Sequence, residues 1–217
     1  MAVCIEAFDI SKVAVTPFTK REVIKNNYKV IFMTNIKYNY EPFKLQVNDI
    51  ILNKYCIPTY INPKTEMPNS KYIYIRKMIQ RDFLCVPVIN KLKKVLDSIN
   101  MFIDGNVDNI MTYNTLHKIF LSSYKPEYTT NTGYTKNPYF NAYFRYDNKT
   151  NKITTKIYEI QEDGTNIQKD MTFKEIEDKF HNLTEATSVS MILSLDKLWM
   201  NKEDTSGIKI FIDELTL

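Results

Sequence analysis

Ser188-Val-Ser-Met-Ile-Leu-Ser-Leu-Asp-Lys-Leu-Trp-Met200, followed after a polar turn by Ile208-Lys-Ile-Phe-Ile-Asp-Glu214, decides the fold class of this 217-residue chain. Both segments are rich in apolar residues, and Asn201–Gly207 between them has the composition of a turn. Such a pattern is typical of two strands joined in sequence. The chain therefore ends, by prediction, in β-structure.

Further strands are predicted upstream, because apolar residues either cluster or alternate with polar ones. Alternation is clearest at 43–52, where every second residue of the first half is Phe, Leu or Val. A turn at 147–151 is expected to join two neighbouring strands into a hairpin, and 162–164 to close it. The additional predicted strands are 28–34, 43–52, 71–79, 140–147 and 152–160.

Helical periodicity occurs in three places. Apolar residues recur at steps of three and four over 89–103, which predicts an amphipathic helix. A shorter helix is predicted over 112–121, and a Thr-x-x-Glu capping box opens another at 172–180. A long loop is expected at 122–139. This order favours a mainly β fold with helices (α+β), either a partly open barrel or an α+β sheet.

Composition sets limits on class and compartment. The net charge is +4, and the three cysteines are widely spaced, so a disulfide framework is not expected. The N-terminus lacks the pattern of a signal peptide, and no apolar run approaches the roughly 18 residues of a membrane span. We therefore expect an intracellular, reducing location: host cytoplasm, a viral factory or the nucleus.

Catalytic motifs are absent from the sequence. There is no glycine-rich phosphate loop, no dinucleotide-binding fingerprint and no nucleophile elbow. His117 and His181 have no Cys, His or carboxylate nearby at ligand spacing, and the cysteines are scattered. We therefore expect no enzyme activity, no cofactor and no metal.

Positive charge is concentrated between residues 71 and 94. This segment holds seven basic residues and one acidic residue, so its net charge of +6 exceeds the +4 of the whole chain. Strand alternation would place Tyr72, Tyr74 and Arg76 on one face. Basic grooves that follow phosphates, with aromatic rings that stack on bases, are how proteins bind single strands without sequence preference.

A second group of tyrosines and basic residues lies at 124–146. Alternation puts Tyr143 and Arg145 on the face opposite Phe144, and Lys156 and Tyr158 on one face of the next strand. A strand tyrosine is more often packed against a core than stacked on a base, and a lysine-rich helix face is usually only solvated. The nucleic-acid interpretation depends on the two residue types sharing faces.

Five segments together resemble the single-stranded DNA-binding proteins of large nucleocytoplasmic DNA viruses, which are similar to the T7-type phage single-strand binder. They are Asn137–Asp147, Lys156–Tyr158, Thr172–Phe180, Ser188–Lys202 and Gly207–Leu215. The resemblance implies an OB-fold, a five-stranded partly open barrel with inserted helices and long loops, and a viral or virus-like origin. The excess of 25 lysines over four arginines agrees with an A/T-rich genome.

Residue pattern and resemblance together predict one OB-fold-like domain over 1–217, with an N-terminal extension at 1–27, that protects single-stranded DNA during replication, recombination or repair. RNA is the alternative ligand, and a viral structural or assembly protein that binds other proteins is the alternative function. Expected partners are the single strand, replication proteins and a second copy of the chain, with no membrane. The residues expected to contact nucleic acid are Lys71, Tyr72, Tyr74, Arg76, Lys77, Arg81, Lys125, Tyr128, Tyr134, Lys136, Tyr143, Arg145, Lys156 and Tyr158.

Overall fold

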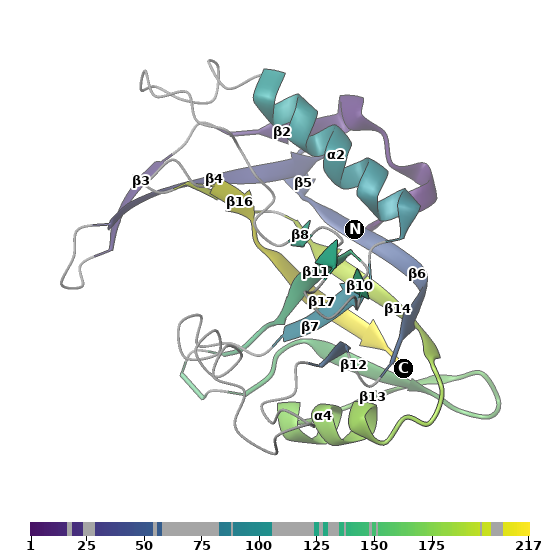
Figure 1. Cartoon of the computed structure of the whole chain (residues 1–217). Coiled ribbons are helices and arrows are strands. Elements are labelled where there is room, and N and C mark those ends of the chain that lie inside the picture. Colours follow the sequence, from purple (N-terminus) through teal and green to yellow (C-terminus); the bar gives the residue numbers. More distant parts are fainter. Residues whose placement is uncertain are drawn as a thin grey trace.

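Strands predominate in the computed structural model of the chain, and two α-helices accompany them among the residues that it describes (Figure 1). The mainly β, α+β class predicted from the sequence is confirmed. The structure describes residues 1–16, 19–23, 29–53, 56–57, 83–87, 89–105, 124–125, 128–129, 135–136, 138–147, 149–150, 152–195, 197–200 and 206–217.

Within these described ranges the largest sheet has nine strands, with the order β1-β6-β14-β17-β11-β7 along its main path. β12 pairs with β17 and with β13, and β8 pairs with β11. These strands are β1 (Val3–Cys4), β6 (Lys44–Leu52), β7 (Phe83–Pro87), β8 (Tyr124–Lys125), β11 (Tyr139–Phe144), β12 (Lys156–Ile160), β13 (Asn166–Lys169), β14 (Thr187–Ser194) and β17 (Ile210–Thr216).

A second sheet has six strands in the order β16-β15-β4-β2, with β3 and β5 also paired to β4. The strands are β2 (Val13–Val15), β3 (Thr19–Val23), β4 (Lys29–Tyr38), β5 (Glu41–Pro42), β15 (Lys197–Met200) and β16 (Ser206–Ile208). A separate pair joins β9 (Tyr128–Thr129) to β10 (Thr135–Lys136). The described sheets are not closed into a barrel, so the five-stranded partly open barrel is not confirmed.

Two helices lie at opposite ends of the nine-stranded sheet (Figure 1). α2 (Asn90–Gly105) contacts two short 3-10 helices, η1 (Ile5–Ala7) and η2 (Ile10–Lys12). α4 (Phe173–His181) lies beside β12 and β13. It begins at the predicted capping box, in which Thr172 and Glu175 each bind the other's backbone N–H.

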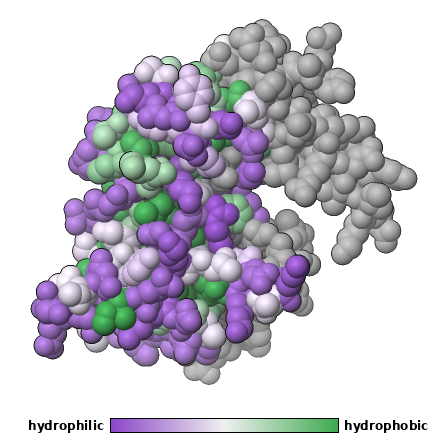
Figure 2. Space-filling model, turned by 180° about the vertical axis from the view of Figure 1, so that it is seen from behind, coloured by the Kyte–Doolittle hydropathy of each residue, from purple (hydrophilic) through white to green (hydrophobic). Residues whose placement is uncertain are grey.

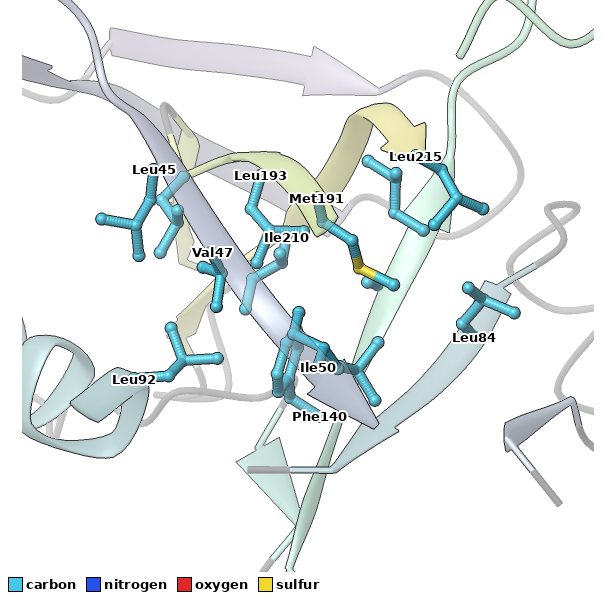
Figure 3. Close-up of a cluster of buried hydrophobic side chains, with 14 of the residues drawn as sticks. Leu45, Val47, Ile50, Leu84, Leu92, Phe140, Met191, Leu193, Ile210 and Leu215 are labelled. Carbon is cyan, nitrogen blue, oxygen red and sulfur yellow. The ribbon is translucent and has the colours of Figure 1, made fainter. Parts of the chain in front are cut away.

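One face of the nine-stranded sheet carries the main hydrophobic core (Figure 3). Along β11 the residues Phe140, Ala142 and Phe144 are fully buried on this face. Their neighbours at odd positions therefore point to the opposite face. Other buried members of this core are Leu45 and Val47 of β6, Leu84 and Val86 of β7, Leu92, Leu96 and Ile99 of α2, Phe180 of α4, and Ile210 and Ile212 of β17.

β17 has three partner strands, one along one edge and two in succession along the other. β14 runs antiparallel along one side, while β11 and then β12 run parallel along the other. At the change, the buried Thr155 hydroxyl accepts the Arg145 N–H at 2.9 Å and donates to the Ile212 carbonyl at 2.7 Å. Opposite it, the β14 register skips Asp213, so this residue forms a β-bulge.

Several local predictions need correction. The hairpin of 140–147 with 152–160 was wrong. The described residues of these segments form one isolated antiparallel bridge, Tyr146 to Ile153, and no ladder, because both strands pair in parallel with β17. The 162–164 turn does form, with Gly164 at φ +81°, but it joins β12 to β13, which was not predicted.

The other element predictions have mixed outcomes. The helix at 89–103 is confirmed as α2. The single strand expected at 188–200 is two strands, β14 and β15, in different sheets, and the loop at 122–139 contains three short strands. The strand at 71–79 and the helix at 112–121 lie outside the described residues.

The first residues of the chain add strands to both sheets. β1 pairs with β6 and β2 pairs with β4, while Ile5 and Val13 are buried in the main core. The segment predicted as an N-terminal extension therefore contributes directly to the packing.

Candidate nucleic-acid interface

The face of the nine-stranded sheet opposite the main core carries a second, smaller hydrophobic cluster. We call this side the outer face. Alternation along β7, β11 and β17 brings Phe83, Cys85, Tyr143 and Phe211 together here, with Tyr139 packed beside them. The outer face of these strands therefore carries a layer of aromatic side chains, and polar residues of the same strands flank this layer.

Tyr143 lies at the centre of this aromatic layer. Its ring centroid is 5.6 Å from that of Phe83 and 6.3 Å from that of Phe211, with tilted planes. The Tyr143 side chain is 9% exposed, and burial raises the pKa of its phenol despite an opposing hydrogen bond with Asn141. The ring thus packs within the sheet face and does not present a flat surface to solvent.

Two cations lie over these rings. The Lys209 Nζ is 5.0 Å from the Tyr143 centroid and 5.4 Å from the Phe211 centroid. The Arg145 guanidinium carbon is 4.6 Å from the Phe211 centroid. Cation–π attraction at these distances contributes about 0.5–2 kcal/mol, more where water is excluded. The rings therefore hold two positive charges at the outer face.

Asp213 connects three donors beside the rings. Arg145 Nε donates to one carboxylate oxygen, while Lys44 Nζ at 2.6 Å and the Ser194 hydroxyl at 2.8 Å contact the other. Burial alone would raise the pKa of Asp213, but these three donors outweigh it and lower the pKa below its ordinary value. The bulge at Asp213 turns this carboxylate toward its partners.

A second ion pair joins β12 to β17 on the outer face. The Nζ of Lys156 in β12 is 3.0 Å from Oε1 of Glu214 in β17. Ile157 is buried in the main core, so its neighbours Lys156 and Tyr158 point to the outer face. The named cations Lys44, Arg145, Lys156 and Lys209 exceed the carboxylates Asp213 and Glu214 by two charges.

The structure places four of the predicted contact residues on this face. Tyr143 and Arg145 lie together, as alternation predicted, and Lys156 and Tyr158 lie on the neighbouring strand. Lys125, Tyr128 and Lys136 belong by backbone to β8, β9 and β10, with side chains outside the described part. Those wholly outside the described residues are Lys71, Tyr72, Tyr74, Arg76, Lys77, Arg81 and Tyr134.

The sequence analysis missed three residues: Lys209, directly before β17, and Phe211 and Asp213 of β17. Their signal is the strict alternation with Ile208, Ile210 and Ile212, which are buried in the main core. This alternation places a lysine, a phenylalanine and an aspartate on the face opposite the core, and it predicts that they belong to one surface site.

The part of the chain that the structure describes contains no group of three or more His, Cys, Asp or Glu side chains placed to bind a metal ion. Neither α2 nor α4 has the length and apolar character needed to cross a bilayer, and these are the two α-helices among the described residues.

No protein-family model matches the chain, and none of the curated proteins matches it.

Proposed function

We propose that the outer face binds single-stranded nucleic acid, DNA in the first place, with little preference for base sequence. The observation that carries the proposal is the placement of Lys209 and Arg145 over a packed aromatic layer. Lys44 and Lys156 lie in the same row of strands. A row of cations fixed across several strands can follow a phosphate backbone.

In this proposal, contacts between cationic side chains and phosphates contribute most of the binding. Tyr143 and Phe211 are 9% and 8% exposed, so bases do not reach their ring faces directly. Instead the rings position Lys209 and Arg145, which contact phosphates. Stacking on bases falls to two half-buried residues, Tyr139 beside the cluster and Tyr158 of β12. No base-specific hydrogen bond is needed, because every base has a π-face.

The finer form of the proposal is an OB-fold protein of a virus or virus-like element that protects strands during replication, recombination or repair. It rests on the sequence resemblance described above.

The proposal is tested by fluorescence anisotropy with labelled oligo(dT) and a duplex of equal length at two salt concentrations. We expect tighter binding of the single strand, with log affinity falling by about 0.7 per phosphate contact for each unit of log salt. Equal affinity for both nucleic acids, or binding insensitive to salt, would contradict it.

A protein-assembly function is the second candidate, and one observation favours it. All four residues of β13 are exposed, and among the described strands β13 pairs only with β12. Ile160 and Ile167 of this hairpin are 57% and 43% exposed. An open edge of this kind can pair with a strand of another chain. Association that depends on protein concentration, without preference for single strands, would favour this function.

A further inference from the structure

A cavity of about 580 Å³ lies between β12, β13 and the beginning of α4. Its volume falls within the roughly 300–1,000 Å³ that small-ligand sites occupy. Three lysines line it: Lys152, Lys156 and Lys169. None of the residues of the aromatic layer lines it, although Lys156, which points to the outer face, does.

Two of these lysines have no ion-pair partner among the described residues. Lys156 is held by Glu214, but neither Lys152 nor Lys169 has such a carboxylate. The carboxylate of Glu159, which interacts electrostatically with Lys169, is already ion-paired with Lys179 of α4. Asp170 is the one carboxylate among the described lining residues, so the lining carries a net charge of +2.

The rest of the lining has an apolar part and a polar part. Ile153 and Met171 supply apolar surface. Behind them Phe173 is buried, and its ring lies edge-on to that of Phe144, with 5.5 Å between the ring centroids. Thr154 and Gln168 supply groups that can hydrogen-bond. Figure 2 shows that the described surface seen from behind is mainly hydrophilic, with hydrophobic side chains in small separate patches. This cavity therefore combines apolar surface with Lys152 and Lys169.

The N-terminus of α4 does not account for the site. Thr172 and Glu175 satisfy each other's backbone N–H groups, and the Glu175 carboxylate already lies at the positive end of the helix. An anion in the cavity would depend on the lysines.

We propose that this cavity binds a phosphate-bearing heterocycle, that is, a nucleotide. The heterocycle packs on the half-buried side chains of Ile153 and Met171, and Lys152 and Lys169 contact the phosphate. This inference stands on the cavity and not on the outer-face proposal. The ligand is either a free nucleotide or one nucleotide of a bound strand. In the second case, Lys156 lies where the strand passes between the outer face and the cavity.

Equilibrium dialysis of radiolabelled dTMP against the full chain tests the proposal. The key variant is Lys152→Gln with Lys169→Gln. The matched control, Lys12→Gln with Lys149→Gln, changes two exposed lysines outside the lining. We expect the wild type and the control to bind dTMP, and the key variant to bind it at least tenfold more weakly. Circular dichroism checks that each variant is folded.

Competitors test the two parts of the ligand. Unlabelled thymidine and inorganic phosphate should each displace dTMP more weakly than dTMP itself. Absence of dTMP binding, equal binding by the key variant, or displacement by phosphate as strong as by dTMP would overturn the proposal.

Oligo(dT) binding separates the two sources of the nucleotide. If the key variant loses dTMP but retains oligo(dT), the ligand is a free nucleotide; if it loses both, the cavity holds part of the strand. Binding of dTMP by a wild type that does not bind oligo(dT) would support the cavity and contradict the outer-face proposal.

Discussion

Arg145, the residue after β11, forms an ion pair with Asp213 at the bulge of β17, and its guanidinium also lies over Phe211. One side chain is thus held from two directions, by a carboxylate and by a ring. Asp213 is 11% exposed, whereas Arg145 and Lys44 are 36% and 40% exposed. The carboxylate therefore anchors two cations whose outer sides remain accessible to solvent.

Replacing Asp213 by Asn should destabilise the protein. Asp213→Asn keeps the size of the side chain but loses its charge, which weakens the bonds from Lys44 and Arg145. Because both cations are partly solvated, we expect a loss of about 1–2 kcal/mol in the free energy of unfolding, measured by urea denaturation at pH 7. Asp97→Asn, which removes an exposed i,i+4 pair with Lys93, should cost less than about 0.5 kcal/mol. Equal losses in the two variants would contradict the anchoring role.

Lowering the pH should remove the same contribution of Asp213 to stability. The pKa of Asp213 in the folded state is lowered from its ordinary value of 3.8, so the folded state favours the ionised form. The stabilisation is fully present above the unfolded value and is lost as the pH falls through the folded pKa. The difference in unfolding free energy between wild type and Asp213→Asn should therefore shrink steadily below pH 3.8. A constant difference between pH 7 and the acid limit would contradict this assignment.

Thr155 should be essential for the junction between β11 and β12. Its buried hydroxyl bonds two backbone groups where β17 changes partner, and Thr155→Val leaves both without that bond. We expect a loss of about 1–3 kcal/mol in the free energy of unfolding. The neighbouring Thr154→Val, at an exposed position, serves as control and should change stability by less than about 0.5 kcal/mol. A Thr155→Val variant as stable as the control would show that the junction does not need the hydroxyl.

Local patterns were sufficient for the elements whose signals are local. The capping box at Thr172 and the apolar repeat of α2 predicted two helices, and alternation around Phe144 placed Tyr143 and Arg145 on one face. In each case the deciding contacts are formed within a few residues, so the sequence window contains them.

Long-range pairing was the part that local patterns could not supply. β17 takes β11 and β12 in parallel along one edge, although more than fifty residues separate Ile157 from Leu215. The turn at 147–151 suggested a hairpin because a turn signal does not reveal which strand lies beside the next. For the same reason the contact of Lys44 in β6 with Asp213 in β17 was not predicted.

The central claim is that Lys209, fixed over Tyr143 and Phe211, contacts the phosphates of a single strand. The most direct measurement is the salt dependence of oligo(dT) binding by Lys209→Gln, with Lys12→Gln, an exposed lysine of η2, as the matched control. The account predicts weaker binding by Lys209→Gln at low salt and a slope of log affinity against log salt reduced by about 0.7. It predicts wild-type affinity and slope for Lys12→Gln. If Lys209→Gln has the affinity and slope of the wild type, the outer face does not bind the strand.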